Sequence, residues 1–219
     1  MVEFSKNTDE RKRREERRGK DAAKPYGVFM RTLSWLLLKG GGWTVTGHRP
    51  QSKRVFVVSA PHTSNWDFVW VLSFAVHFQL RISWLGKHTL FKKPFGGFMR
   101  SLGGIPVIRH ERTNLVQDLI QTYEEYDALA LTVPPEGTRG HTEYWKSGFY
   151  QIAKGAGVPL LLSYLCYETK EGGFGPEVWT TDDVRSDMDK VREFYRGKVG
   201  KHAKLNSQIR LREEDREED

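Results

Sequence analysis

Short apolar runs alternate with segments of helical spacing, and this alternation limits the folds open to the chain. The runs at residues 55–58, 128–133 and 160–166, with shorter ones near 82–85 and 105, predict buried strands. Helices are expected after residue 68 and at 113–126 and 147–155, a turn after the glycine-rich residues 172–176, and a surface helix at 187–201. Strands joined by crossover helices lie parallel in one sheet. We therefore expect an α/β fold, with a mainly parallel sheet flanked by helices.

The two charged ends of the chain set the expected domain boundaries. Residues 1–24 are dense in both signs of charge and lack the apolar stretch of a secretory signal, so we expect a disordered arm there. Residues 25–205 are expected to form one domain, and residues 206–219 a charged C-terminal tail. Because the end of the chain is mainly acidic, most of the net charge of +7 must lie in the body. A basic body indicates an anionic partner.

A histidine and an aspartate lie five positions apart just after the first apolar run. In one continuous helix, His62 and Asp67 would point about 140° away from each other. A strand-to-helix turn can bring them together, with Ser64 or Asn65 capping the helix. The carboxylate would then hold one imidazole tautomer and leave the second ring nitrogen free as a base. The alternative is a structural hydrogen bond at a helix N-terminus.

A second polar loop follows the apolar run at 128–133, where the carboxyl end of a strand is expected. Ligands of open α/β sheets bind at such ends. Gly137 permits close backbone approach, Thr138 offers a hydroxyl, and Arg139 offers a planar fork suited to phosphate. Arg109 likewise ends an apolar segment, so two guanidinium groups could converge on one anion. Each arginine could instead be a surface salt-bridge partner, and the loop an ordinary polar turn.

These blocks, in this order and spacing, resemble the PlsC-type glycerolipid acyltransferases, the 1-acyl-glycerol-3-phosphate acyltransferase family. The likeness covers about residues 55–164. His62 and Asp67 match the His-x4-Asp block of that family. The other matching positions are Lys87, the segment 104–109 with Arg109, the block Glu136, Gly137, Thr138 and Arg139, the pair Lys146 and Gly148, and residues 158–160. An ordered set of blocks is far more specific than any single motif.

The resemblance implies acyl transfer from acyl-CoA or acyl carrier protein to a hydroxyl of lysophosphatidic acid or a similar lyso-glycerolipid. In that reaction His62 is the general base and Asp67 orients it, while Arg139, Arg109 and Lys87 bind the acceptor phosphate together with Gly137 and Thr138. Glu136 is placed in the site, bonding an acceptor hydroxyl or ordering Arg139. A thioester is already activated, so we expect no metal and no cofactor beyond the donor itself.

The sequence departs from the family pattern at several positions, and these leave other acceptors open. Pro61, Ile108, Pro135, Gly140 and Leu162 replace residues usual in that family. A different lyso-lipid or an amine-bearing acceptor is therefore the alternative substrate. A catalytically idle membrane-binding module is the alternative from another class. We expect no nucleic-acid partner, because the basic residues are interleaved with large apolar ones.

Two segments predict that the protein rests on a membrane surface. Residues 26–38 place Phe29, Leu33 and Leu36 on one helical face, but a membrane span needs roughly twenty apolar residues, so we expect an interfacial helix. Residues 91–100 mix aromatic side chains with cations, as expected at anionic headgroups. We place the protein at the cytoplasmic face of a membrane, monotopic or peripheral. The alternatives are an ordinary core helix and a loop with inward-facing aromatics.

Overall fold

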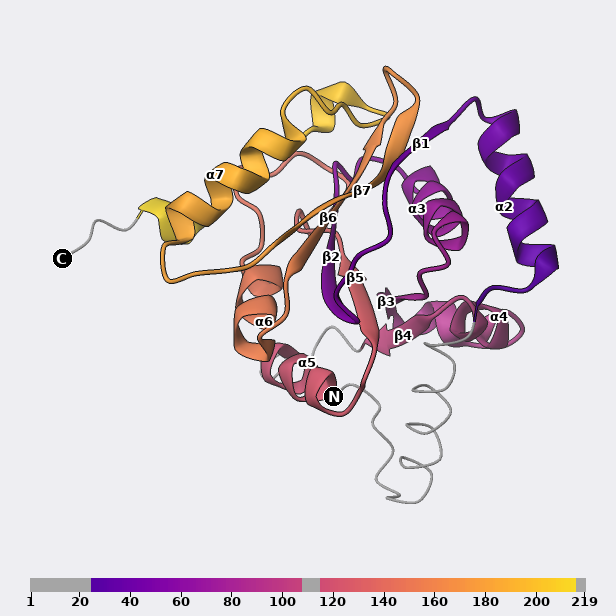
Figure 1. Ribbon diagram of the computed structural model, residues 1–219, viewed down its shortest axis with the longest axis horizontal. Helices are drawn as coiled ribbons and strands as arrows, with labels where there is room; N and C mark the ends of the chain where they lie inside the picture. Colours follow the sequence, from indigo (N-terminus) through magenta and orange to yellow (C-terminus); the bar gives the residue numbers. More distant parts are fainter. Residues whose placement is uncertain (1–24, 108–114, 216–219) are drawn as a thin grey trace.

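The computed structural model describes residues 25–107 and 115–215. Within them, seven strands form one sheet in the order β1-β7-β6-β2-β5-β3-β4 (Figure 1). The strands are β1 (Thr44–Gly47), β2 (Arg54–Ala60), β3 (Ile82–Lys87), β4 (Gly104–Val107), β5 (Leu129–Val133), β6 (Leu160–Cys166) and β7 (Glu171–Val178). Neighbouring strands are parallel except β6 and β7, which pair antiparallel. The predicted α/β fold with a mainly parallel sheet is confirmed.

Helices cover both faces of the sheet (Figure 1). They are α2 (Val28–Gly40), α3 (Trp66–His77), α4 (Gly96–Ser101), α5 (Leu115–Glu124), α6 (Gly148–Ala156) and α7 (Val184–Tyr195), with short 3₁₀ turns at His88–Phe91, Ala203–Leu205 and Arg212–Asp215. Helix α3 packs against one face, with α2 outside it, whereas α5, α6 and α7 lie on the other face. Among the described residues, no helix is long and apolar enough to cross a membrane.

The position of β2 at the centre of the sheet explains why its sequence is an unbroken apolar run. Val55 and Val57 enter the core beneath α3, while Phe56 and Val58 enter the core beneath α5 and α6. All four side chains are fully buried. A parallel strand covered on both faces needs apolar residues at every position, not at alternate ones.

Strand β7, which contains residues 172–176, was not predicted; the turn was expected after these residues, and the strand ends at Val178. The glycines there are required by close packing. A Cβ atom on Gly172 would lie 2.5 Å from the Phe74 ring, and one on Gly173 would lie 2.0 Å from the carbonyl oxygen of Thr46. Glycine in a strand often marks such a close approach of another group.

The last helix begins earlier and ends earlier than the predicted span of 187–201. Helix α7 runs from Val184 to Tyr195, and the Asp183 side chain caps it by accepting a hydrogen bond from the Ser186 amide at 2.9 Å. The boundary of the C-terminal tail at 206 stays a prediction. Its described part nevertheless contacts the domain, since Leu211 is fully buried in the core and its backbone forms an isolated β-bridge with Trp145.

Candidate active site

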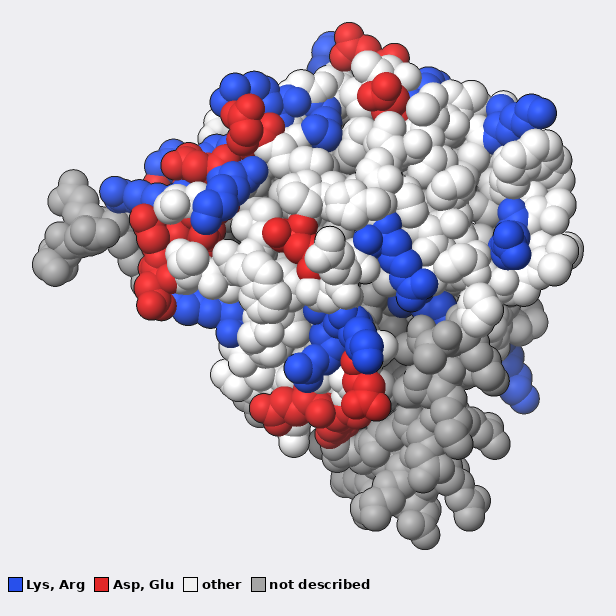
Figure 2. Space-filling model, in the orientation of Figure 1, with Lys and Arg blue, Asp and Glu red and all other residues white. Residues whose placement is uncertain are grey.

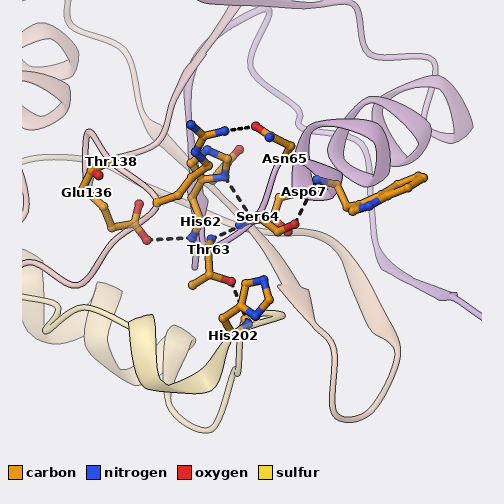
Figure 3. A network of polar contacts seen from close by, with 12 residues as sticks. His62, Thr63, Ser64, Asn65, Asp67, Glu136, Thr138 and His202 are labelled. Carbon is orange, nitrogen blue, oxygen red and sulfur yellow. Dashed lines mark hydrogen bonds and ion pairs between the residues drawn. The ribbon is translucent and has the colours of Figure 1, made fainter.

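The loop between β2 and α3 brings His62 and Asp67 together. Strand β2 ends at Ala60 and α3 begins at Trp66, so Asp67 falls in the first turn of the helix. His62 Nδ1 lies 3.1 Å from Asp67 Oδ2 (Figure 3). The predicted contact is therefore present. The imidazole is partly exposed, with 22% of its side-chain surface accessible, whereas Asp67 is buried.

Asp67 is held by three further hydrogen bonds. The backbone amides of Thr63 and Ser64 each donate to Oδ2 at 2.8 Å. The hydroxyl of Tyr167 donates to Oδ1 at 2.7 Å. Together with His62, these donors compensate a carboxylate that is only 2% exposed. The position of Asp67 is thus fixed from the backbone on one side and from a distant tyrosine on the other.

The two residues expected to cap α3 have different roles. The hydroxyl of Ser64, the residue before the N-cap, accepts a hydrogen bond from the Trp66 amide at 3.2 Å. Asn65 makes no capping bond. Its side-chain oxygen instead accepts a hydrogen bond from Arg139 (Figure 3). This bond joins the loop after β2 to the loop after β5.

The buried side chain of Glu136 forms a second connection between these two loops. Its Oε1 accepts a hydrogen bond from the backbone amide of His62 at 2.9 Å, and the residue is only 3% exposed. Burial raises the pKa of Glu136 to about 6. Among the described residues, Oε2 has no hydrogen-bond partner. Glu136 therefore bonds the loop that carries His62, whereas Arg139, the partner considered in the sequence analysis, bonds Asn65.

The remaining residues of this block lie at the surface. Gly137, Thr138 and Arg139 are exposed, and Gly137 has a positive φ of 66°, which favours glycine. The Thr138 hydroxyl accepts a hydrogen bond from the Gly140 amide at 3.3 Å. Arg139 is therefore an exposed guanidinium attached to the loop that carries His62.

The two other predicted cations belong to β3 and to the segment after β4. Lys87 is exposed and ends β3, in register with Val107 of β4. Because β2, β5 and β3 are parallel and paired side by side, their carboxyl ends share one edge of the sheet. Lys87 therefore lies at the same edge as the loops that carry His62 and Arg139. Arg109 and Ile108 lie outside the described residues.

Residues 43–161, more than half of the chain, match the sequence profile of the family described as Acyltransferase. The chain belongs to the acyltransferase family. Its fold is similar to the crystal structure of the 1-acyl-sn-glycerophosphate (LPA) acyltransferase PlsC from Thermotoga maritima, with a TM-score of 0.54 over 87% of this chain and 80% of that chain. The sequence identity is 17%, so this likeness concerns the fold. No curated protein sequence matches the chain significantly.

Two contacts of this candidate site were not predicted. Tyr167 directly follows β6, the strand that pairs with β2 on the side away from β5. Had the strand order been known, the residue just after β6 would have been a candidate neighbour of the His62 loop. The backbone amide of His202 donates to the Thr63 hydroxyl at 3.1 Å, so a loop near the C-terminus supports the same segment (Figure 3). No pattern in the sequence indicates this second contact.

Proposed function

We propose that the protein transfers a fatty acyl group from a thioester, acyl-CoA or acyl carrier protein, to a hydroxyl of lysophosphatidic acid or a similar lyso-glycerolipid. The observation that carries this proposal is the geometry of His62. Its Nδ1 is bonded to a buried carboxylate, and none of the described residues hydrogen-bonds its Nε2. An imidazole fixed in this way is suited to accept a proton from a bound hydroxyl.

In the proposed reaction, His62 Nε2 takes the proton of the acceptor hydroxyl as its oxygen attacks the thioester carbonyl. The carbon–oxygen bond of the new ester forms, and the carbon–sulfur bond of the donor breaks. The departing thiolate receives the proton from the imidazolium, so a free thiol leaves and His62 is restored. Asp67 keeps Nδ1 protonated and stabilises the positive charge while it exists. Correct placement of the two substrates supplies a large part of the rate.

The acceptor phosphate is proposed to bind at the carboxyl edge of the sheet, where Arg139 and Lys87 supply positive charge, Gly137 allows close backbone approach and Thr138 offers a hydroxyl. Arg109, which lies outside the described residues, is proposed as a third cation from the family resemblance alone. Support comes from the hydrogen bond that Arg139 donates to Asn65. Asn65 lies two residues before Asp67. This hydrogen bond attaches the Arg139 guanidinium to the loop that carries His62. A phosphate held there would bring a hydroxyl of the same glycerol unit toward His62.

Mass spectrometry of the lipids formed from a panel of lyso-lipids with acyl-CoA or acyl carrier protein tests this function. We expect an esterified product from lysophosphatidic acid or a close relative, with release of one free thiol per ester. An amide product, or esterification of phosphate-free acceptors alone, would contradict the proposed acceptor class. Absence of product with every pair would favour the idle membrane-binding module.

Replacement of Arg139 by lysine should raise the KM for the acceptor about tenfold or more and leave the KM for the donor unchanged. Lysine keeps the charge but cannot form the paired hydrogen bonds of a guanidinium with phosphate. Steady-state kinetics with each substrate varied in turn measure this effect. Arg212→Lys, distant in sequence in the 3₁₀ turn Arg212–Asp215, is a matched control. An unchanged acceptor KM would contradict the role of Arg139, as would a loss confined to the donor.

The protein is also proposed to rest on the cytoplasmic face of a membrane through α2 and the segment around α4. Helix α2 is attached to α3 by a hydrogen bond from the Ser34 hydroxyl to the Ser73 carbonyl at 2.7 Å. Its outer face exposes large apolar side chains, as does the segment around α4: Val28, Phe29, Leu33, Trp35 and Leu36, with Leu90, Phe95 and Phe98. In Figure 2 the visible surface over α2 carries cations but no acidic residue. An apolar face with flanking cations suits an anionic membrane.

Vesicle sedimentation should show stronger binding to anionic than to neutral liposomes. Salt should weaken the binding without removing it, because apolar insertion is not screened. The double substitution Trp35→Glu and Leu36→Glu should reduce binding at least about tenfold, since it places charge on the face that enters the lipid. Trp179→Glu, at an equally exposed tryptophan after β7, is the control. Equal partitioning with and without anionic vesicles would contradict the membrane proposal.

A further inference from the structure

We infer that Tyr167 is a positioning residue for the carboxylate of Asp67, an inference that rests on the proposed function of the His62 and Asp67 pair. The Tyr167 hydroxyl donates to Asp67 Oδ1 at 2.7 Å. The bonds from His62, Thr63 and Ser64 all reach the other oxygen, Oδ2. Within the described part of the chain, Tyr167 is thus the donor that occupies Oδ1.

This division between the two oxygens determines how the carboxylate is oriented. The terminal torsion of an aspartate is broad and roughly two-fold, so donors at one oxygen alone fix its plane poorly. A donor at Oδ1 restricts rotation about this torsion and keeps Oδ2 directed toward His62 Nδ1. Asp67 is 2% exposed, so solvent has little access to replace a donor that is lost.

The phenol is itself held in place on several sides. The Tyr167 amide donates to the Val199 carbonyl at 2.9 Å. Its ring meets the Trp43 ring edge to face, with 5.0 Å between centroids, and the Lys170 ammonium lies 5.7 Å from the centroid. Burial, followed by the bond to Asp67, raises the pKa of Tyr167 above its ordinary value. The hydroxyl therefore stays protonated, and remains a donor, throughout the neutral range.

The aromatic neighbour of Tyr167 also contacts the helix that carries Asp67. The ring centroid of Trp43 lies 5.2 Å from that of Trp70 and 5.8 Å from that of Phe74, and both of these residues are in α3. Tyr167 and the helix that carries Asp67 thus pack against the same tryptophan, although Tyr167 and Asp67 are 100 residues apart in the chain. The hydrogen bond between them connects the end of β6 to the first turn of α3.

Tyr167→Phe tests the inference, because it removes the hydroxyl and keeps the ring. We expect kcat to fall about tenfold, with the KM of each substrate within about twofold of the parent, because a small misplacement of a catalytic group lowers the rate strongly. The NMR resonance of the His62 Nδ1 proton bonded to Asp67 should shift or broaden. This signal does not depend on turnover, so it tests the contact even if the proposed reaction is wrong.

A matched control, Tyr164, lies three residues earlier, within β6. The Tyr164 hydroxyl is 2.7 Å from the Thr46 hydroxyl and, among the described residues, does not hydrogen-bond Asp67. Tyr164→Phe removes a comparable hydrogen bond and should leave both kcat and the His62 resonance unchanged. Thermal melting of both variants reports any loss of stability separately. Equal kinetic effects from the two substitutions would overturn the inference, as would an unchanged resonance in Tyr167→Phe.

A double-mutant cycle with Asp67→Asn completes the test. If Tyr167 acts through Asp67, Tyr167→Phe should change kcat less than about twofold once the carboxylate is gone, since contacting residues are not additive. A full tenfold loss in the Asp67→Asn background would show that Tyr167 acts independently, and would overturn the inference. The proposed function is tested separately, by the parent activity and by its loss in His62→Ala.

Discussion

His62→Ala is expected to abolish acyl transfer and to leave the fold intact. A general base is worth at least about a hundredfold in rate, and none of the described residues is placed to substitute for it. The imidazole is partly exposed, and the bond from the His62 amide to Glu136 does not depend on the side chain. Stability should therefore change little. Product formation measured by lipid mass spectrometry, together with thermal melting by circular dichroism, checks both parts.

The control for this variant is His77→Ala, at the exposed far end of α3. It removes an imidazole from the same helix region without approaching the site, and its activity should match the parent. Retention of more than about a tenth of the activity in His62→Ala would remove the general-base role. The thioester donor should then be examined for attack by another group.

Asp67→Asn is expected to lower kcat by about three orders of magnitude, because an amide at this position permits the wrong imidazole tautomer. The carboxylate accepts from His62, Thr63, Ser64 and Tyr167, whereas an amide can accept through its oxygen only. Single-turnover kinetics with a saturating acceptor measure the loss. The KM values should change far less than kcat.

Asp182→Asn provides the comparison, since Asp182 is an exposed partner of Lys154 remote from His62 in the sequence. It should keep nearly full activity, as exposed ion pairs contribute little to stability. A loss of less than about tenfold in Asp67→Asn would mean that the tautomer of His62 is fixed by something other than this carboxylate. The contact would then be structural.

The strands that could be predicted are those whose own residues form a continuous apolar run. Strand β2 is apolar at each of the positions 55–58 because both faces are covered, and β5 and β6 show the same signal. Strand β7 was not predicted, because glycine is unusual inside strands. The reason for its glycines lies in Phe74 and Thr46, which are distant in sequence. Local patterns cannot reveal a close approach by a remote group.

The contacts of the site likewise include some that the sequence could predict and some that it could not. The contact between His62 and Asp67 could be predicted because it is local and depends on one strand-to-helix turn. The contact between Tyr167 and Asp67 could not, because it depends on β6 lying beside β2, and strand order is set by packing of the whole sheet. The partner of Glu136 was missed for the same reason, since β5 and β2 are neighbours only in the folded sheet.

The buried bond between Glu136 and the His62 amide has a consequence for how variants of the 136–139 loop behave. The loop after β5 and the loop after β2 are joined by this bond at 2.9 Å and by the bond between Arg139 and Asn65. A substitution at Glu136 would reach the imidazole through the backbone, without touching either substrate. Under the proposed function, a substitution at Glu136 that reshapes the acceptor pocket would also change the placement of the base, because the same carboxylate holds the His62 backbone.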